Sequence, residues 1–295
     1  PCAYLQNSGL GNAINPLASI AHSKVYSIPM LLLIGWRGSP NLKDEPQHMV
    51  KGRITRQLLD LLDIKYCVIR EKKDFIKLKN IIKFSKSKKR PVACLIENKI
   101  LQGSKKPIAK NKNANLKRAK VIEQIIKNIK ARTNIIATTG FTSRELMQIR
   151  EKENYKQGSD FYMVGGMGHS AAISLGVSLN TKKQTICLDG DGSLLMHLGS
   201  MATVGFFAKK NFKHILLNNN SHESVGEQVT NAKKINFKNV CKGLGYKKYL
   251  IIKNEKDLVK KLKLFFKCKG PAFLEILIKT GSISNLMRPN NLLKI

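Results

Sequence analysis

The sequence is poor in acidic residues, with 19 Asp and Glu against 53 Lys and Arg and a formal net charge of +34. Such a charge is typical of proteins that bind nucleic acids or anionic membranes. Aromatic residues make up only 6% of the chain, so few side chains could stack on single-stranded bases. The excess is mostly lysine, with its densest stretches at 71–90, 105–120 and 253–269. We therefore attribute the charge to a composition rich in Lys, Ile and Asn, and keep specific nucleic-acid binding as the lesser alternative.

Cysteine pairs and long apolar runs are also missing. The six cysteines are far apart, with no CxxC pair and no Cys/His cluster at zinc spacing, which argues against a disulfide framework or a zinc site. The longest apolar run, at 30–34, is far shorter than the ~20 residues that cross a bilayer, and residues 1–20 do not resemble a signal peptide. We expect a cytoplasmic protein with reduced cysteines and no membrane partner. The first residue is not Met, and we expect the start of the chain to be missing.

A hydrophobic content of 42% predicts a globular protein, and its apolar segments alternate between strand and helix patterns. In the first part, the expected strands are 3–7, 26–36, 66–70 and 91–97, and the expected helices are 12–21 and 53–63, with a polar loop at 37–52. In the second part, the expected strands are 134–137, 161–164, 184–188, 213–217 and 272–278, and helices are expected at 169–179 and 195–208. Two further helices are expected to begin at Thr142, with a capping box to Glu145, and at Asn254.

This alternation predicts α/β domains, each with a doubly wound parallel sheet. We expect residues 1–102 to form the later part of a first domain that is truncated at its N-terminus, and residues 132–295 to form a second domain. Residues 103–131 are rich in Lys and poor in structural signals, so we expect a basic linker, with room for a helix over 119–129.

Two strand ends of the second domain carry metal-binding side chains. Asp189-Gly190-Asp191-Gly192-Ser193 follows one apolar strand, Asn218-Asn219-Asn220-Ser221 follows the next, and Asn219 comes 28 residues after Asp191. Because ligands of open parallel sheets bind at the carboxyl ends of the strands, we expect the two side chains to meet. One carboxylate and neutral oxygens suit a Mg²⁺ ion that also binds phosphate oxygens. Gly192 and Ser193 open a helix whose N–H groups could face an anion.

Glycine-rich turns follow two other strands of this domain. Val164-Gly165-Gly166-Met167-Gly168 could let the backbone approach a flat ring, with Met167 wedged beneath it; a glycine turn with a core methionine is the alternative. Thr138-Thr139-Gly140 and Thr142 end another strand and are candidates for lining a diphosphate pocket.

The GDG…NN pattern resembles the signature of thiamine diphosphate enzymes. Within that group, the stretches at 4–17, 27–38, 43–48 and 218–228 resemble the phosphonopyruvate decarboxylase family and the related sulfopyruvate decarboxylases. The resemblance implies a pyrimidine-binding first domain and a diphosphate-binding second domain. It implies that Asp191, the Asn219 side chain and the Ser221 carbonyl hold Mg²⁺. The implied contacts of thiamine diphosphate are Thr139, Gly140, Thr142, Gly165, Gly166, Met167, Asp191, Gly192, Ser193, Asn219 and Ser221. One departure is Asn220-Ser221, where a glycine and a small residue are expected.

The same resemblance implies a Mg²⁺- and thiamine-diphosphate-dependent decarboxylase. The implied reaction of phosphonate metabolism converts phosphonopyruvate to phosphonoacetaldehyde and CO₂; sulfopyruvate or another 2-oxo acid is the alternative substrate. It also implies a homo-oligomer with active sites between subunits. Members of the family carry, ahead of the stretch matched here, a glutamate that activates the cofactor's pyrimidine, and no residue here has its setting. We therefore expect the chain as given to be inactive without that segment, which leaves a non-catalytic cofactor-binding protein as a further alternative.

Candidates for catalysis come from both domains. His222 and Ser224 directly follow the metal-ligand loop, so His222 could act as a general acid or contact the substrate, although a lone histidine is as often structural. The resemblance also places Gln6 and Asn7 near the substrate. Arg37, His48 and Lys43 could bind the phosphonate. Arginine suits this group best, because its guanidinium can donate two parallel hydrogen bonds, whereas Lys43 is more simply explained as a solvent-exposed lysine of a loop.

Overall fold

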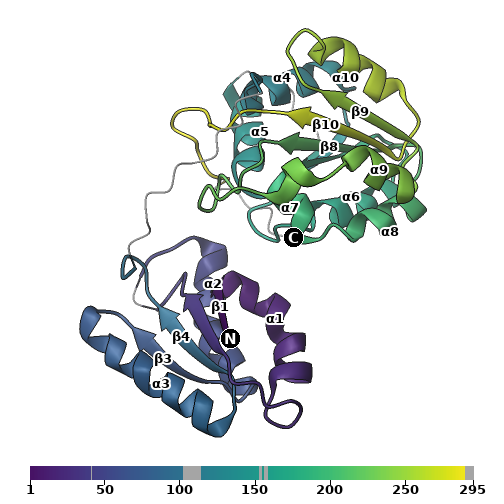
Figure 1. Ribbon diagram of the computed structural model, residues 1–295. Helices are drawn as coiled ribbons and strands as arrows, with labels where there is room; N and C mark the ends of the chain where they lie inside the picture. Colours follow the sequence, from purple (N-terminus) through teal and green to yellow (C-terminus); the bar gives the residue numbers. More distant parts are fainter. Residues whose placement is uncertain (41, 102–113, 153–154, 156–158, 290–295) are drawn as a thin grey trace. The chain divides into compact units, whose positions relative to one another are not determined.

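The computed structural model describes residues 1–40, 42–101, 114–152, 155 and 159–289 (Figure 1). The chain divides into two compact units, residues 1–106 and residues 107–295. Each unit has one sheet, and all neighbouring strands in both sheets run parallel. The predicted α/β class with two parallel sheets is confirmed. No helix among the described residues is both long and apolar enough to cross a membrane.

The first unit has strand order β1-β2-β4-β3. Its elements, in chain order, are β1 (Cys2–Gln6), η1 (Asn7–Gly9), α1 (Leu10–Pro16), the π-helical turn η2 (Leu17–Ala21), β2 (Leu31–Gly35), α2 (Pro46–Leu61), β3 (Lys65–Ile69), η3 (Lys72–Asp74), α3 (Phe75–Lys88) and β4 (Val92–Ile96). Side chains alternate between the faces of a strand, and β2 shows this directly. Its Leu32 and Ile34 pack with Leu10 and Leu59 of α1 and α2, while Leu31 and Leu33 pack with Leu78 of α3.

Two predictions for the first unit need correction. The expected polar loop at 37–52 is wrong in its second half, because α2 begins at Pro46, seven residues before the expected helix start. Proline at the first helical position has its φ angle already set and lacks only an N–H group that would have no partner there. The Lys-rich stretch at 71–90 contains the unpredicted helix α3, which buries Ile81 and Ser85 and turns its lysines outward. A capping box between Glu71 and Asp74 precedes it.

The second unit has strand order β6-β5-β7-β8-β10-β9. Its elements are α4 (Arg118–Asn128), β5 (Asn134–Ala137), α5 (Phe141–Lys152), β6 (Ser159–Tyr162), α6 (Ser170–Leu179), β7 (Thr185–Gly190), α7 (Asp191–Met196), α8 (Ser200–Phe207), β8 (Phe212–Asn218), η4 (Asn231–Lys234), α9 (Phe237–Gly243), β9 (Lys248–Ile252), α10 (Leu258–Lys267) and β10 (Ala272–Leu277).

Helices cover both faces of this second sheet (Figure 1). Ile186 and Leu188 of β7 belong to a core with residues of α4, α5 and α10, whereas Cys187 belongs to a second core with residues of α6, α8 and α9. The same alternation holds along β8 and β10. The sheet is therefore doubly wound, as predicted.

Local details of the second unit differ from expectation. The helix expected at 195–208 is two helices, α7 and α8, interrupted at His197–Gly199, and β9 and α9 were not predicted. The expected capping box at Thr142 does not form, because α5 begins at Phe141 and the Glu145 carboxylate accepts from the backbone of Ile283.

The range expected to be a linker contributes to the core of the second unit. Residues 102–113 lie outside the described residues, but helix α4 buries Val121, Ile122, Ile125 and Ile126. These side chains pack with Ile135 and other strand residues because they form one apolar stripe along the helix.

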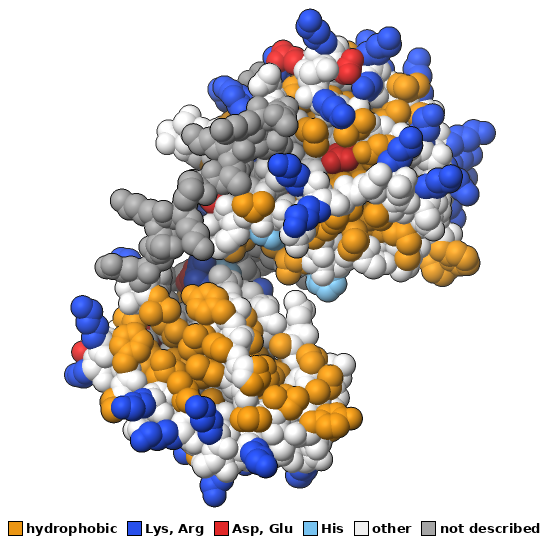
Figure 2. Space-filling view, viewed as in Figure 1, with side chains coloured by type: hydrophobic (Ala, Val, Ile, Leu, Met, Phe, Trp, Pro, Cys, Tyr) orange, Lys and Arg blue, Asp and Glu red, His pale blue; other side chains and the backbone are white. Residues whose placement is uncertain are grey.

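The lysines and arginines do not form one continuous patch on the face shown in Figure 2. They are scattered over the visible face of both units, with polar and apolar side chains between many of them. On this face, the scattered charge agrees with the compositional explanation.

Candidate functional site

Three neighbouring strands of the second sheet, β5, β7 and β8, end at the same edge. Thr138, Asp191 and Asn219 are the residues that directly follow these strands, and all three are buried. They line an open pocket together with His222 and Ser224. Of the residues predicted to contact the cofactor, those that line this pocket are Thr139, Thr142, Met167, Asp191, Gly192, Ser193, Asn219 and Ser221. Gly140, Gly165 and Gly166 are not among its lining residues.

Asp191 begins α7 and is only 2% exposed. Its carboxylate accepts a hydrogen bond from Thr230 Oγ1 at 2.5 Å and lies 3.4 Å from the backbone nitrogen of Asn219. Burial raises the pKa of Asp191 to about 6, because a desolvated carboxylate is costly to ionise, although the hydrogen bonds oppose this rise. A divalent cation at this position would stabilise the ionised form.

The loop after β8 turns sharply beside Asp191. Asn220 has a positive φ of 58°, a conformation that asparagine tolerates better than most residues, and this explains why glycine is expected there. The side-chain oxygen of Asn219 accepts from the backbone nitrogen of Ser221 at 3.0 Å. The buried Ser221 hydroxyl has no hydrogen-bond partner among the described residues. The loop thus offers several oxygen atoms next to one buried carboxylate.

The loop from Asn220 to Thr230 is closed by backbone hydrogen bonds that fix His222. The nitrogen of His222 donates to Gln228 O at 2.8 Å, and that of Thr230 donates to Asn220 O at 3.0 Å. Burial lowers the pKa of His222. Its ring lies against the backbone of Gly192, where an added Cβ would come within 2.4 Å of His222 Nδ1.

The turn after β5 and the glycine turn after β6 approach the same pocket. Thr138 donates to the hydroxyl of Ser193 at 2.8 Å, and that hydroxyl accepts from Gly168 N at 3.1 Å. Gly140 has a φ of +99° and packs against Ser224, so a side chain at this position would be strained and would collide with the Ser224 hydroxyl. Ser193 therefore joins the three turns that surround the pocket.

Comparison with known proteins agrees with this geometry. Residues 138–276 match the family described as thiamine pyrophosphate enzyme, C-terminal TPP binding domain. Over 98% of its length, the chain is 33% identical to a phosphonopyruvate decarboxylase of Streptomyces viridochromogenes and 32% identical to one of Streptomyces hygroscopicus, of which it covers 75% and 74%. It is also 36% identical to the sulfopyruvate decarboxylase subunit beta of Methanocaldococcus jannaschii. This match covers 44% of the chain and 66% of that relative.

The chain belongs to the phosphonopyruvate decarboxylase family. It is thus a member of a family of carbon–carbon lyases, and its cofactor is thiamine diphosphate, with Mg²⁺ as the usual accompanying metal. The residues present fit this pair. Asp191 supplies one buried carboxylate, the loop after β8 supplies neutral oxygens, and such hard oxygen donors are the ligands that Mg²⁺ takes beside phosphate groups.

The family residues predicted in the first unit lie at the ends of its strands. Gln6 ends β1, and its side chain accepts from Ser8 Oγ. The Asn7 amide donates to Arg37 O and Thr55 Oγ1 and accepts from Arg37 N, so it joins the ends of β1 and β2. Within this unit the structure therefore brings Asn7 and Arg37 together.

The three candidates for phosphonate binding differ in their surroundings. The Arg37 guanidinium is paired with Asp44, donating from Nε to Oδ2 at 2.6 Å, and this pairing holds the pKa of Asp44 below its usual range. His48 is half-buried, its Nδ1 has no partner among the described residues, and burial lowers its pKa. Lys43 is exposed. Among the described residues, Arg37 is thus the one candidate of the three that is held by an ion pair inside the unit.

The structure also reveals pocket residues that the sequence did not indicate. Arg118 and Glu223 line the pocket and form an ion pair, and Thr230 bonds to Asp191. One signal was available in the sequence: Arg118 opens a stretch whose apolar residues form one helical stripe. Arg118 lies 105 residues before Glu223, and Asp191 lies 39 residues before Thr230, so no local pattern joins either pair.

We predict that Gly192→Ala displaces His222. Because the new methyl group would come within 2.4 Å of the imidazole, the ring must move away from the pocket floor. A displacement of about 1 Å in an active-site group can cost on the order of 100-fold in turnover. The imidazole C–H resonances in NMR spectra report the movement directly, whatever the turnover.

Gly176→Ala is the matched control for this variant. An added Cβ at Gly176 of α6 meets nothing within 4 Å, and alanine is preferred in a helix, so His222 resonances should be unchanged. If Gly192→Ala leaves the His222 resonances where they are in the unaltered protein, the proposed contact is wrong.

Proposed function

We propose that this protein catalyses the thiamine-diphosphate- and Mg²⁺-dependent decarboxylation of phosphonopyruvate to phosphonoacetaldehyde and CO₂. The observation that carries the proposal is the buried carboxylate of Asp191 beside the Asn219 loop, at adjacent parallel strand ends and in a chain of this family. Curated relatives of the chain are named as phosphonopyruvate decarboxylases, and this name supports the substrate.

In this proposal, Asp191, the Asn219 side chain and the Ser221 carbonyl hold Mg²⁺, which binds the diphosphate. Thr139, Thr142 and Ser193 stand where they can contact the diphosphate oxygens. Met167 lines the same pocket and would support the thiazolium ring. When bound, thiamine diphosphate supplies the electron-accepting ring that makes the loss of CO₂ feasible. The protein's own part is to bind, orient and exchange protons.

His222 is the group best placed to exchange a proton with the substrate. It lines the pocket directly after the proposed metal ligand Ser221. Because burial lowers its pKa, the imidazole is neutral at neutral pH and can either donate or accept a proton. Ser224 lines the pocket beside it and would be a polar contact for the substrate.

In an active form of the protein, we predict that His222→Ala lowers turnover by about 100-fold, within the range of general acid–base catalysis, and changes the affinity for thiamine diphosphate far less. Steady-state rates of CO₂ release and calorimetric titration of the cofactor separate the two effects. His22→Ala, which removes a histidine that lies near Asp63 in the first unit, is the control. Equal rates for His222→Ala and the unaltered protein would remove His222 from the mechanism.

The second anionic group of the substrate needs a cationic partner. Arg37, His48 and Lys43, with Gln6 and Asn7 at the end of β1, remain our candidates in the first unit. Since Asp44 already pairs with Arg37, a phosphonate would have to share or displace this carboxylate. Sulfopyruvate is the alternative substrate, because a curated relative of the chain is named as a subunit of sulfopyruvate decarboxylase.

We also propose a homo-oligomer with active sites at the subunit interfaces. A relative is named as subunit beta of its enzyme, which supports assembly in this family. Large apolar side chains are exposed in both units, among them Tyr4 and Leu61 in the first and Phe206 in the second, at 72%, 81% and 82%. Apolar side chains gather on the face of the first unit seen in Figure 2. The cytoplasmic location predicted from the cysteines, all of them free, stays a prediction.

CO₂ release from phosphonopyruvate and from sulfopyruvate, with and without thiamine diphosphate and Mg²⁺, tests the proposal. Faster release from phosphonopyruvate supports it, and faster release from sulfopyruvate replaces the substrate. Cofactor binding without release from either acid supports the non-catalytic alternative. Absence of cofactor binding, together with salt-dependent retention on DNA, would favour a nucleic-acid-binding function instead.

A further inference from the structure

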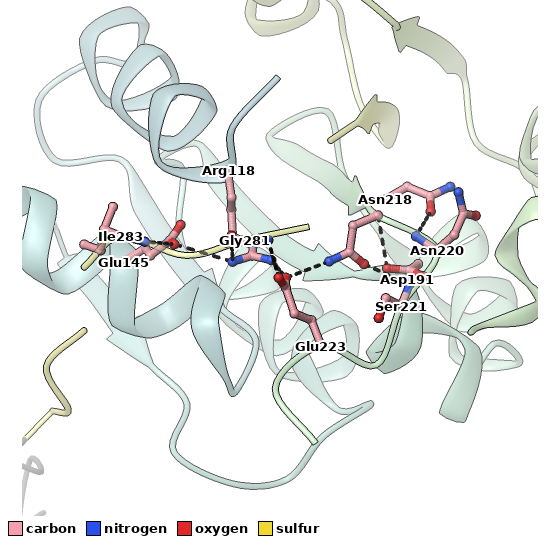
Figure 3. A network of polar contacts seen from close by, with 10 residues as sticks. Arg118, Glu145, Asp191, Asn218, Asn220, Ser221, Glu223, Gly281 and Ile283 are labelled. Carbon is pink, nitrogen blue, oxygen red and sulfur yellow. Dashed lines mark hydrogen bonds and ion pairs between the residues drawn. The ribbon is translucent and has the colours of Figure 1, made fainter. Parts of the chain in front are cut away.

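Glu223 joins the proposed metal-ligand loop to two distant parts of the second unit. Its side chain is only 8% exposed and accepts hydrogen bonds from Arg118 of α4, from the backbone nitrogen of Gly281 and from Asn219 Nδ2, the last at 2.9 Å. Figure 3 shows Glu223 between Arg118 and Gly281 on one side and the loop of Asn220 and Ser221 on the other. The contact between Glu223 and Asn219 Nδ2 therefore acts on the side chain that is proposed to bind Mg²⁺.

The contact determines which end of the Asn219 amide is turned towards Glu223. A carboxylate presents acceptors, so the end of the amide that faces Glu223 must be the NH₂ group. The oxygen end then faces the other way and accepts from the backbone nitrogen of Ser221 at 3.0 Å. Both ends of the amide are consistent with this orientation. Without Glu223, only the Ser221 N–H group would oppose rotation of the amide, and the NH₂ group, which does not bind a cation, would replace the oxygen more readily.

Glu223 is itself held by a buried cation. The Arg118 side chain is 4% exposed and lies between Glu223 and Glu145, with Nη1 3.5 Å from the Glu145 carboxylate. Its guanidinium carbon is 5.5 Å from the centre of the Phe141 ring, and Nη1 donates to Gly281 O at 3.3 Å. With contacts on several sides, the arginine leaves Glu223 little freedom to turn away from Asn219.

We propose that Glu223 is a positioning residue that orients the Asn219 amide for Mg²⁺, and that Arg118 holds Glu223 in place for this purpose. The proposal rests on the proposed role of Asn219 as a metal ligand. Side chains that hydrogen-bond to a metal ligand without touching the metal commonly contribute about 10- to 100-fold to metal affinity.

The same network reaches the segment that follows β10. Besides the contact of Gly281 with Glu223, Ile283 N donates to Glu145 at 3.1 Å. Farther along, Met287 N donates to Gln148 of α5 at 2.9 Å, and Arg144 donates to Met287 O at 2.7 Å. If Mg²⁺ fixes Asn219 and thereby Glu223, amide hydrogen exchange at Gly281 should slow when the metal and cofactor bind.

The test is calorimetric titration of Mg²⁺ into the full chain at saturating thiamine diphosphate. Glu223→Ala should weaken Mg²⁺ binding by about 10- to 100-fold. Glu223→Gln keeps one acceptor that can serve Asn219 and should recover most of this loss. Glu227→Ala, which removes an exposed glutamate of the same loop, should bind as the unaltered protein does.

A double-mutant cycle separates orientation from a general structural effect. On a background of Asn219→Ala, the substitution Glu223→Ala should cause no further loss of Mg²⁺ affinity, because no amide remains to be oriented. Unchanged Mg²⁺ affinity in Glu223→Ala, or a loss that is the same with and without Asn219, would overturn the proposal. If the unaltered protein does not bind thiamine diphosphate in a Mg²⁺-dependent manner, the proposed function fails instead.

Discussion

Replacing Asp191 with asparagine is expected to stabilise the cofactor-free protein and, at the same time, to abolish Mg²⁺-dependent binding of thiamine diphosphate. The carboxylate is buried, and its pKa is raised to about 6, so the folded protein at neutral pH holds a charge that the unfolded chain would solvate better. Relative to the usual aspartate pKa of 3.8, this corresponds to roughly 3 kcal/mol of lost stability. Asparagine removes the charge, retains an oxygen that can accept from Thr230, and cannot replace the anionic ligand.

The stability that Asp191→Asn gains should increase with pH. Because the folded-state pKa of Asp191 lies above the unfolded value, protonation favours the folded state, and the stability associated with this group is lost as the pH rises from about 4 to about 6. Asp191→Asn lacks this dependence. Its advantage should therefore be small near pH 4 and complete above pH 7.

Thermal unfolding of the cofactor-free proteins measures this effect. For a unit of this size, a gain of 2–3 kcal/mol corresponds to an increase in Tm on the order of 5 °C. Asp60→Asn, an exposed aspartate on α2, is the control and should change stability by less than about 0.5 kcal/mol. An Asp191→Asn protein that melts lower than the unaltered protein at pH 8, or that still binds the cofactor with Mg²⁺, would contradict the assignment.

Arg118→Met should destabilise the second unit by about 3–5 kcal/mol, because it leaves two buried carboxylates without their cation. Glu145 and Glu223 are both almost fully buried, and burial already raises the pKa of Glu145 although Arg118 lowers it. With the arginine removed, protonation of the Glu145 carboxylate becomes more favourable in the folded state. The deficit should therefore shrink as the pH falls.

The neighbouring ion pair on the same helix provides a matched control. Lys120 pairs with Glu255 at the surface, so Lys120→Met should cost less than about 1 kcal/mol. Urea unfolding followed by circular dichroism compares the two variants. A similar, small shift of the urea midpoint in both would mean that the buried network contributes little to stability.

The sequence predicts the fold because its main signals are local. Apolar strands alternate with helices, and the parallel direction of the strands follows from that alternation, whereas the order of the strands in each sheet was not predicted. The elements that were not predicted have weaker local signals. In α3, the few apolar residues are interspersed with eight charged or polar residues, and α2 begins inside a stretch of polar residues. Helix α2 begins at Pro46, and composition alone assigns a proline to a loop rather than to the start of a helix.

The candidate site was predictable where it depends on strand ends. Asp191 and Asn219 directly follow β7 and β8, and adjacent parallel strands bring such residues together whatever the helices between them do. Arg118, Glu145, Glu223 and Gly281 could not be connected in this way, since Arg118 lies 105 residues before Glu223 and 163 before Gly281. Only tertiary packing places them beside one another. The roles of Gln6, Asn7, Arg37 and His48 stay predictions.

The position of α4 decides where the chain can be cut for work on the isolated second unit. A fragment that starts at residue 132 would discard Val121, Ile122, Ile125 and Ile126, and so leave the facing strands and α10 without their apolar cover. It would also discard Arg118, and with it the partner of Glu223. A fragment that retains Leu116, which pairs with Ile278 next to β10, keeps this cover in place and is the appropriate starting point for expression.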